Sequence, residues 1–251
     1  MLMKKALFLV SSESEIETLK EFGKKFREKY NVETDALYVK DVLKYEIFPV
    51  TIEGIGVNIG SNYAFKEYME LEERNFNNVK EKLGSEFSKV YSEDGETIET
   101  ALNELKKYDL IVVVKNEKVS PYLKELLRSN FKPLIILPNV TEFSFDKILL
   151  LDDGAYNANK TLYTFFYMFD EQKVDVLRVN VDSKDYLKER FGDNCNLVEK
   201  EGDPFKTIME ESEKYDFILM GDLRYTIMVE RITRKLGVKL LENLKKPIFI
   251  V

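Results

Sequence analysis

GETIETALNELKKYDLIVVV at residues 95–114 decides the fold, because it returns 107 residues later as GDPFKTIMEESEKYDFILMG at residues 202–221. Each copy starts with glycine, continues with a run of helical periodicity, and reaches a Tyr-Asp pair followed by aliphatic residues. Such aliphatic runs are typical of strands buried on both faces of a parallel sheet. The repetition indicates that the chain contains two copies of one structural unit.

Three shorter matches extend the repeat. KALFLVSS at 5–12 matches KILLLDDG at 147–154, ALYV at 36–39 matches VLRV at 176–179, and KPLII at 132–136 matches KPIFI at 246–250. The separation of matching residues falls from 140 at Val39 to 107 at Asp109, so the first copy carries 33 extra residues. We therefore predict one domain at 1–140, with an insertion at about 41–85, and a second at 144–251.

The order of elements predicts an α/β fold. Residues 13–30, 96–107 and 203–214 read as helices, and Asp203-Pro204 is typical of a helix start, with Asp as the N-cap. Each copy reads as βαβ…βαβ, which favours a doubly wound, mainly parallel sheet of five strands with helices on both faces.

Composition excludes several classes of site. The chain has no histidine and a single cysteine, Cys195, so it has no Ser-His-Asp triad, no histidine-bound metal and no internal disulfide. Its net charge of −7 gives no overall positive field, and we expect no nucleic-acid or membrane partner. No apolar run approaches membrane-spanning length, and we expect a cytoplasmic protein.

The sequence resembles the universal stress protein family in its tandem two-domain form. The resemblance is carried by residues 147–154, Gly202-Asp203-Pro204, residues 215–221 and residues 246–251, with weaker counterparts at 5–138. It implies two Rossmann-like domains of the adenine nucleotide alpha hydrolase type. It also implies that they pack as a pseudo-dimer through their last strands, 134–137 and 248–251.

The resemblance further implies candidate nucleotide-binding residues. Asp153 and Gly154 stand where ATP-binding members have the Asp-Gly that ends the first strand, and Val179 stands where the second strand meets the base. The family's phosphate loop reads Gly-x2-Gly-x9-Gly-Ser/Thr; here Gly221 is its first glycine. The later loop positions hold cations, Arg224 and Arg234-Lys235. The resemblance thus implies ATP or another adenine nucleotide, with magnesium, as a possible ligand of the second domain.

Simpler interpretations stand beside these. The cations between 224 and 246 also fit a solvated helix face, since Val229, Ile232 and Leu236 form an apolar stripe. Asp153 could cap a helix instead of facing adenosine. Asp152 and Asp153 point to opposite faces of a strand, so the pair does not predict a metal site.

In the first copy, Ser11 and Val114 replace Asp153 and Gly221. We therefore expect no ATP in the first domain.

Three functions follow, in order. The first is a non-catalytic stress-response or regulatory protein that acts by binding a ligand or a partner, either another protein or a second copy in a dimer. The second is an adenine-nucleotide-binding sensor. The third is a nucleotide hydrolase or transferase, for which no catalytic residue and no metal ligand is assigned.

Overall fold

The structure is a computed structural model that describes residues 3–41, 59–116, 118–182, 184, 186–221 and 236–251. Strands and helices alternate along the chain, as the sequence predicts. The strands are β1 (Lys5–Val10), β2 (Glu33–Lys40), β3 (Lys89–Asp94), β4 (Leu110–Lys115), β5 (Leu134–Pro138), β6 (Ile148–Leu151), β7 (Val174–Val179), β8 (Cys195–Lys200), β9 (Phe217–Met220) and β10 (Ile248–Ile250).

The helices begin and end at residues suited to it. Ser120 and Asp203 accept main-chain N–H bonds as N-caps of helices that have proline in the first turn, as predicted for Asp203. The helices are α1 (Ile16–Tyr30), α2 (Ile59–Leu83), α3 (Thr97–Leu105), α4 (Pro121–Ser129), α5 (Tyr156–Phe169), α6 (Tyr186–Phe191), α7 (Pro204–Ser212) and α9 (Leu236–Asn243). None of the described helices is long and apolar enough to cross a membrane.

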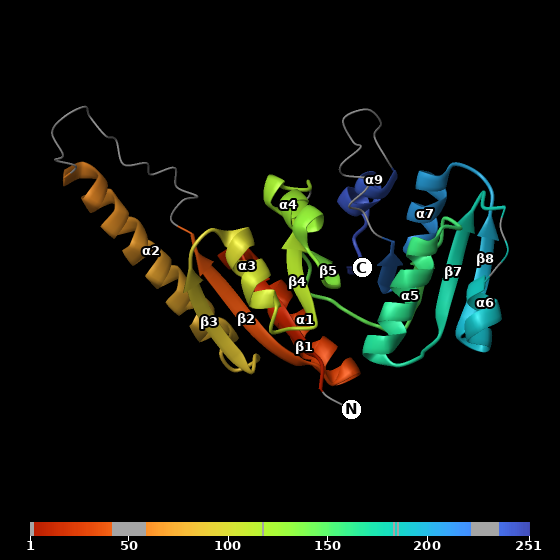
Figure 1. The fold of residues 1–251 in the computed structure, drawn as a ribbon, viewed down its shortest axis with the longest axis horizontal. Helices are drawn as coiled ribbons and strands as arrows, with labels where there is room; N and C mark the ends of the chain where they lie inside the picture. The colour runs from red at the N-terminus through yellow and green to blue at the C-terminus, as the bar shows by residue number, and fades with distance from the viewer. Residues whose placement is uncertain (1–2, 42–58, 117, 183, 185, 222–235) are drawn as a thin grey trace.

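All ten strands form one sheet, in the order β3-β2-β1-β4-β5-β10-β9-β6-β7-β8 (Figure 1). Each half has the same internal order, and every pairing is parallel except that between β5 and β10. Ile248 pairs with Ile136 at this antiparallel joint. The predicted pairing of the last strands is therefore confirmed, and it merges the two five-stranded halves into one continuous sheet.

The strand registers repeat with the separations read from the sequence. Leu9 pairs with Leu37 as Leu151 pairs with Leu177, and Ile111 pairs with Leu134 as Ile218 pairs with Ile248. Side-chain bonds repeat as well. The Tyr108 hydroxyl donates to Asp35 at 2.8 Å, and the equivalent Tyr215 hydroxyl donates to Asp175 at 2.7 Å. The two halves are thus copies at the level of individual bonds.

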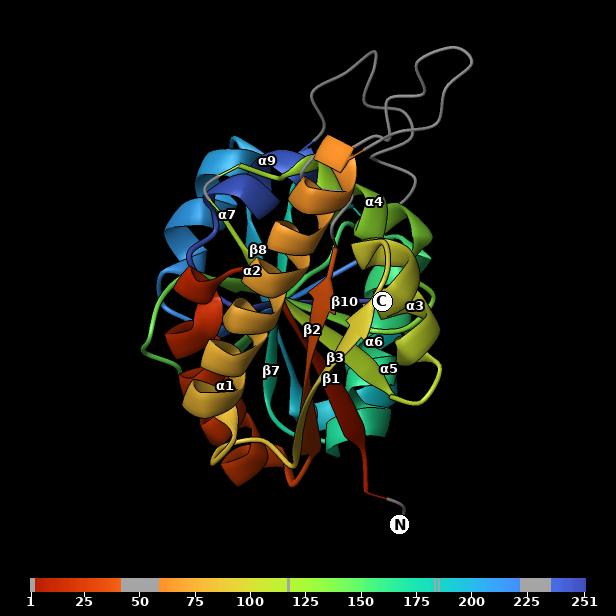
Figure 2. The ribbon, with the colours of Figure 1, turned by 90° about the vertical axis from the view of Figure 1, so that its left-hand side faces the viewer.

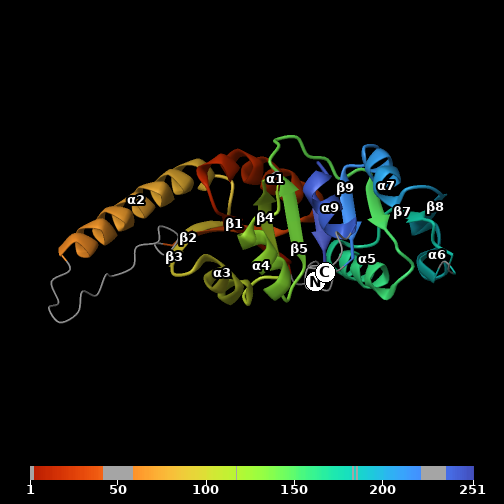
Figure 3. The same cartoon turned by 90° about the horizontal axis from the view of Figure 1, so that it is seen from above.

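Helices cover both faces of the sheet. Seen from its first end, α1 and α2 lie on one side of β1–β3, and α3 lies on the other (Figure 2). The view from above shows helices on both sides along the full length (Figure 3). Both faces of the strands are therefore buried, and the core divides into two clusters, one on each face. This explains the uninterrupted apolar runs of the strands.

The halves are tied together beyond the joint. Phe145, in the connection between them, contacts Phe26 of the first half and Phe217 of the second. The buried Lys115, at the end of β4, donates to the carbonyls of Leu241 and Glu242 at the end of α9, and burial lowers its pKa to about 8. The first half therefore helps to position a helix of the second.

The insertion at about 41–85 includes α2, which packs along β2 and β3. Val79 and Leu83 bury its apolar side, and the Tyr38 hydroxyl donates to Glu72 at 2.6 Å. Part of the insertion, residues 42–58, lies outside the described residues. What the described part does is cover one face of the first half.

Candidate functional site

A cavity of about 500 Å³ lies at the carboxyl ends of the strands in the second half. The last residues of β6, β7 and β9 form its floor, and α7 and α9 cover it (Figure 1). In the strand order of this half, β6 and β9 are the neighbours from which the connections run in opposite directions, the usual ligand site of an open α/β sheet. The lining residues are Leu151, Asp152, Asp153, Asn157, Ala158, Leu177, Val179, Asn180, Val181, Pro204, Ile208, Met220, Gly221, Leu236, Gly237 and Leu240.

Three of the predicted site residues meet at this cavity. Asp153, Val179 and Gly221 come from the ends of three different strands, and all three line it. Gly154 is adjacent and does not line it; its φ is +79°, which favours glycine, and its N–H donates to Asp152 at 2.9 Å. Arg224, Arg234 and Lys235 lie outside the described residues.

The two neighbouring aspartates have different surroundings, as strand alternation predicts. Asp153 is exposed at the mouth of the cavity, and its Oδ1 accepts the N–H of Ala155 at 3.0 Å. Ala155, not Asp153, is the N-cap of α5. The carboxylate therefore stabilises the turn before the helix and still lies at the cavity.

Asp152 is buried in an ion pair that sequence reasoning missed. Its Oδ2 lies 2.7 Å from Nε of Arg178, and both side chains are only 3% exposed. The first half has Val10 and Tyr38 at the equivalent strand positions. An arginine inside the otherwise apolar end of β7 was the available signal. The pair fixes the ends of β6 and β7 relative to each other beside the cavity.

Gly221 allows β9 to approach the start of α5. A Cβ atom at this position would lie 3.0 Å from Cβ of Asn157 and 3.6 Å from its carbonyl carbon. Any larger residue would push α5 and β9 apart at the cavity. The equivalent residue in the first half is Val114, so that half has a different arrangement of strand and helix.

The equivalent region of the first half has changed its chemistry. Tyr122 and Leu123 take the positions of Leu236 and Gly237, and the Tyr122 hydroxyl is buried. Glu15 is buried there and accepts the N–H of Ser11 at 2.9 Å; burial raises its pKa to about 7. Bulkier side chains and a buried acid therefore stand where the second half has its cavity.

The described residues contain no group of three or more Asp, Glu or Cys side chains arranged to hold a metal ion. Within the cavity, the acidic groups are Asp153 and the Arg178-paired Asp152. Within the described part of the chain, Cys195 is buried at the start of β8, away from the cavity lining.

Comparison with known proteins supports the fold. No protein-family model and no curated protein matches the chain. Among solved structures, a universal stress protein from Archaeoglobus fulgidus is similar with a TM-score of 0.69 at 17% identity, covering 98% of this chain and 95% of that one.

Two structures from Pseudomonas aeruginosa are also similar over nearly the whole chain. A putative universal stress protein has a TM-score of 0.56 at 11% identity, covering 99% of this chain and 93% of its own. A functionally unknown protein has a TM-score of 0.55 at 11% identity, covering 99% and 92%. The chain therefore has the Rossmann-like α/β fold of the universal stress proteins.

Proposed function

We propose that this chain is a non-catalytic regulatory protein of the universal stress type, and that its second half responds to an adenine nucleotide. The observation that carries the proposal is the cavity at the ends of β6, β7 and β9, where Asp153, Val179 and Gly221 meet. Its volume lies within the range of small-molecule sites.

The lining suits a nucleoside. Leu177, Ile208 and Leu240 supply apolar walls for a flat base, and Asp153 supplies a carboxylate at the mouth that can accept ribose hydroxyl protons. Asn180 is already committed, because its amide bonds both the carbonyl and the N–H of Gly202, at 2.7 and 3.0 Å. It therefore acts as a wall and not as a ligand group.

Phosphate recognition is assigned to the cations that follow Gly221. Guanidinium groups bind phosphate oxygens through paired hydrogen bonds, which could replace the backbone N–H groups of a glycine-rich loop. Arg224 is three residues beyond Gly221, and Arg234 and Lys235 immediately precede α9, which borders the cavity. This arrangement favours nucleotides over free nucleosides.

The cavity supports binding more than chemistry. Asp152 is held by Arg178, and Asp153 has no histidine to act with, since the chain contains none. Hydrolysis or transfer would need a base and an activated nucleophile that the cavity lining does not supply. A nucleotide would therefore act as a signal read by a partner.

Calorimetry and thermal unfolding with ATP, ADP, AMP and adenosine, each with and without magnesium, test the proposal. A ligand at 100 times its Kd adds about 2.7 kcal/mol of stability. Asp153→Asn should weaken all four ligands, Arg224→Ala should weaken ATP more than adenosine, and Ser11→Ala, at the equivalent position of the first half, should change nothing. Absence of any shift rejects nucleotide binding, and steady release of phosphate from ATP rejects the non-catalytic role.

A further inference from the structure

The solvent face of α5 is unusual for this chain. Tyr156, Tyr163 and Tyr167 are 80%, 46% and 70% exposed, and they lie on one face of the helix with Lys160. α5 contains no acidic residue, although a third of the chain is charged. We refer to Tyr156, Lys160, Tyr163 and Tyr167 as the tyrosine face.

The first half supplies an internal control, because α1 is the copy of α5. Their buried positions run in step: Thr18, Leu19 and Phe22 match Thr161, Leu162 and Phe165. The matching solvent positions then pair Glu17 with Lys160, Lys20 with Tyr163 and Lys24 with Tyr167. One copy has an ordinary charged surface, and the other has replaced it with aromatic rings. Core packing does not explain that replacement, because these side chains point outward.

The rings are held in place by cations of the same chain. Lys4 Nζ lies 4.4 Å from the ring centre of Tyr167, and Arg190 of α6 lies over Tyr163 while its Nε donates to that hydroxyl at 3.1 Å. Tyr186, at the start of α6, is 62% exposed. Such restraint lowers the side-chain entropy that an interface would have to overcome.

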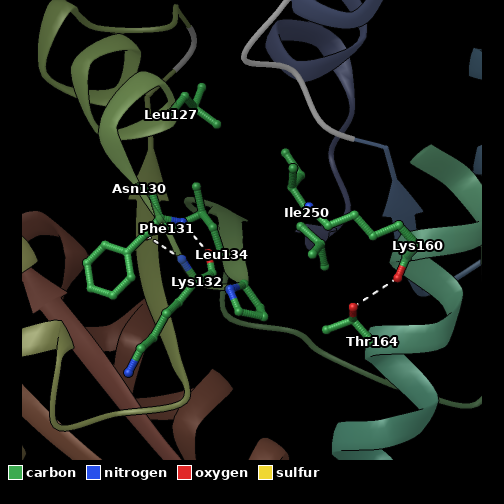
Figure 4. A pocket seen from close by; sticks show the side chains of 10 residues that line it. Leu127, Asn130, Phe131, Lys132, Leu134, Lys160, Thr164 and Ile250 are labelled. Atoms are coloured by element: carbon green, nitrogen blue, oxygen red, sulfur yellow. Dashed lines mark hydrogen bonds between the residues drawn. The ribbon is translucent and has the colours of Figure 1, made fainter. Parts of the chain in front are cut away.

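A hollow of about 160 Å³ borders the tyrosine face. Lys160 and Thr164 line it from α5, and Leu134 and Ile250 line it from the joint between β5 and β10 (Figure 4). The ring of Phe131 points away from the hollow (Figure 4). The exposed aromatic surface is therefore continuous with a small recess in the molecule.

We propose that the tyrosine face is a self-association surface, and that its occupant is α5 of a second copy, packed antiparallel. Tyrosines bury about 200 Å² each, so the exposed fractions of Tyr156, Tyr163, Tyr167 and Tyr186 amount to roughly 500 Å². This is well over half of the ~800 Å² that each partner contributes to a standard interface.

The charges of α5 fit this occupant. Antiparallel pairing about Tyr163 brings Lys160 of each copy next to Tyr167 of the other, because the spacings of three and four residues nearly match. Ammonium groups are attracted to aromatic rings, and α5 has no carboxylate to desolvate. A nucleic acid is disfavoured by the net charge of −7.

Sedimentation of the full chain over a wide concentration range tests the surface. The wild type should reach the mass of two chains, and the double variant Tyr163→Lys, Tyr167→Lys should dissociate about tenfold or more readily. Both positions are exposed, so circular dichroism should show an unchanged fold. The control variant Lys20→Glu, Lys24→Glu alters the matching face of α1 and should associate like the wild type.

Cross-linking identifies the contact itself. Tyr163→Cys should form a disulfide between two chains on mild oxidation, since the two Cβ atoms must approach within about 4.5 Å, and Lys20→Cys should not. A wild type that keeps the mass of one chain overturns the proposal, as does a dimer that the lysine variant leaves intact. Binding of single-stranded oligonucleotides that the lysine variant abolishes would assign the face to nucleic acid instead.

Discussion

Replacing Arg178 with methionine should destabilise the protein strongly, because it leaves Asp152 buried without its cation. Both side chains are 3% exposed and 2.7 Å apart, so water cannot take the place of the guanidinium. Breaking a buried ion pair by removing one partner costs about 3–5 kcal/mol. For a chain of this length, the expected fall in Tm is about 6–20 °C.

The first half suggests how to rescue the variant. Its equivalent residues are Val10 and Tyr38, an uncharged pair in the same strand geometry. The double variant Asp152→Val, Arg178→Tyr should therefore recover most of the lost stability. This result would separate the cost of an unpaired charge from the cost of lost packing.

Urea denaturation at several pH values measures both effects. In Arg178→Met, burial should raise the pKa of Asp152 above its unfolded value. The deficit relative to wild type is then largest at neutral pH and shrinks as falling pH protonates the carboxyl. The exposed pair Lys184–Glu189 is the control, and Lys184→Met should leave the midpoint unchanged. A loss below about 1 kcal/mol in Arg178→Met, or a deficit that is independent of pH, would refute the reasoning.

Three further predictions follow from the duplicated halves. Gly237→Leu, which copies Leu123, should fill the cavity and abolish nucleotide binding in calorimetry while leaving Tm unchanged or higher, since leucine favours a helix by up to about 1 kcal/mol over glycine. Glu15 has a folded pKa of about 7 against 4.5, so stability should decline by about 3 kcal/mol as pH rises from 4.5 to 7, and Glu15→Gln should flatten that decline in urea titrations. Tyr108→Phe and Tyr215→Phe should each cost about 1 kcal/mol and add in the double variant, because their hydroxyl bonds to Asp35 and Asp175 are copies in separate halves; clear non-additivity would contradict their independence.

The sequence predicted the repeat and the strand registers because buried parallel strands are short, contiguous and apolar. The matches at 5–12 and 147–154 therefore align without gaps, and β1 and β6 pair with their neighbours in the same register. The joint was also predictable, since two apolar last strands favour pairing. The continuous ten-stranded sheet follows from that joint.

The site was predictable only where one strand position decides it. Asp153, Val179 and Gly221 end separate strands, and the carboxyl ends of parallel strands lie at one edge. The bond between Asp152 and Arg178 depends on which face each side chain takes in two neighbouring strands, which the apolar pattern did not reveal.

The tyrosines of α5 illustrate a different failure. Aromatic residues are most simply assigned to the core, and Phe165 and Phe169 do lie there. Tyr163 and Tyr167 occupy the opposite side of the same helix, and only the comparison with Lys20 and Lys24 of α1 makes their exposure informative.

The most direct test of the nucleotide proposal is a map of backbone amide shifts during titration with ATP. The account predicts that the amides of Val179 and Gly221 move with saturation, while their counterparts Val39 and Val114 in the first half stay fixed. Shifts confined to the first half, or no shift at Val179 and Gly221 at saturating ATP, would contradict it.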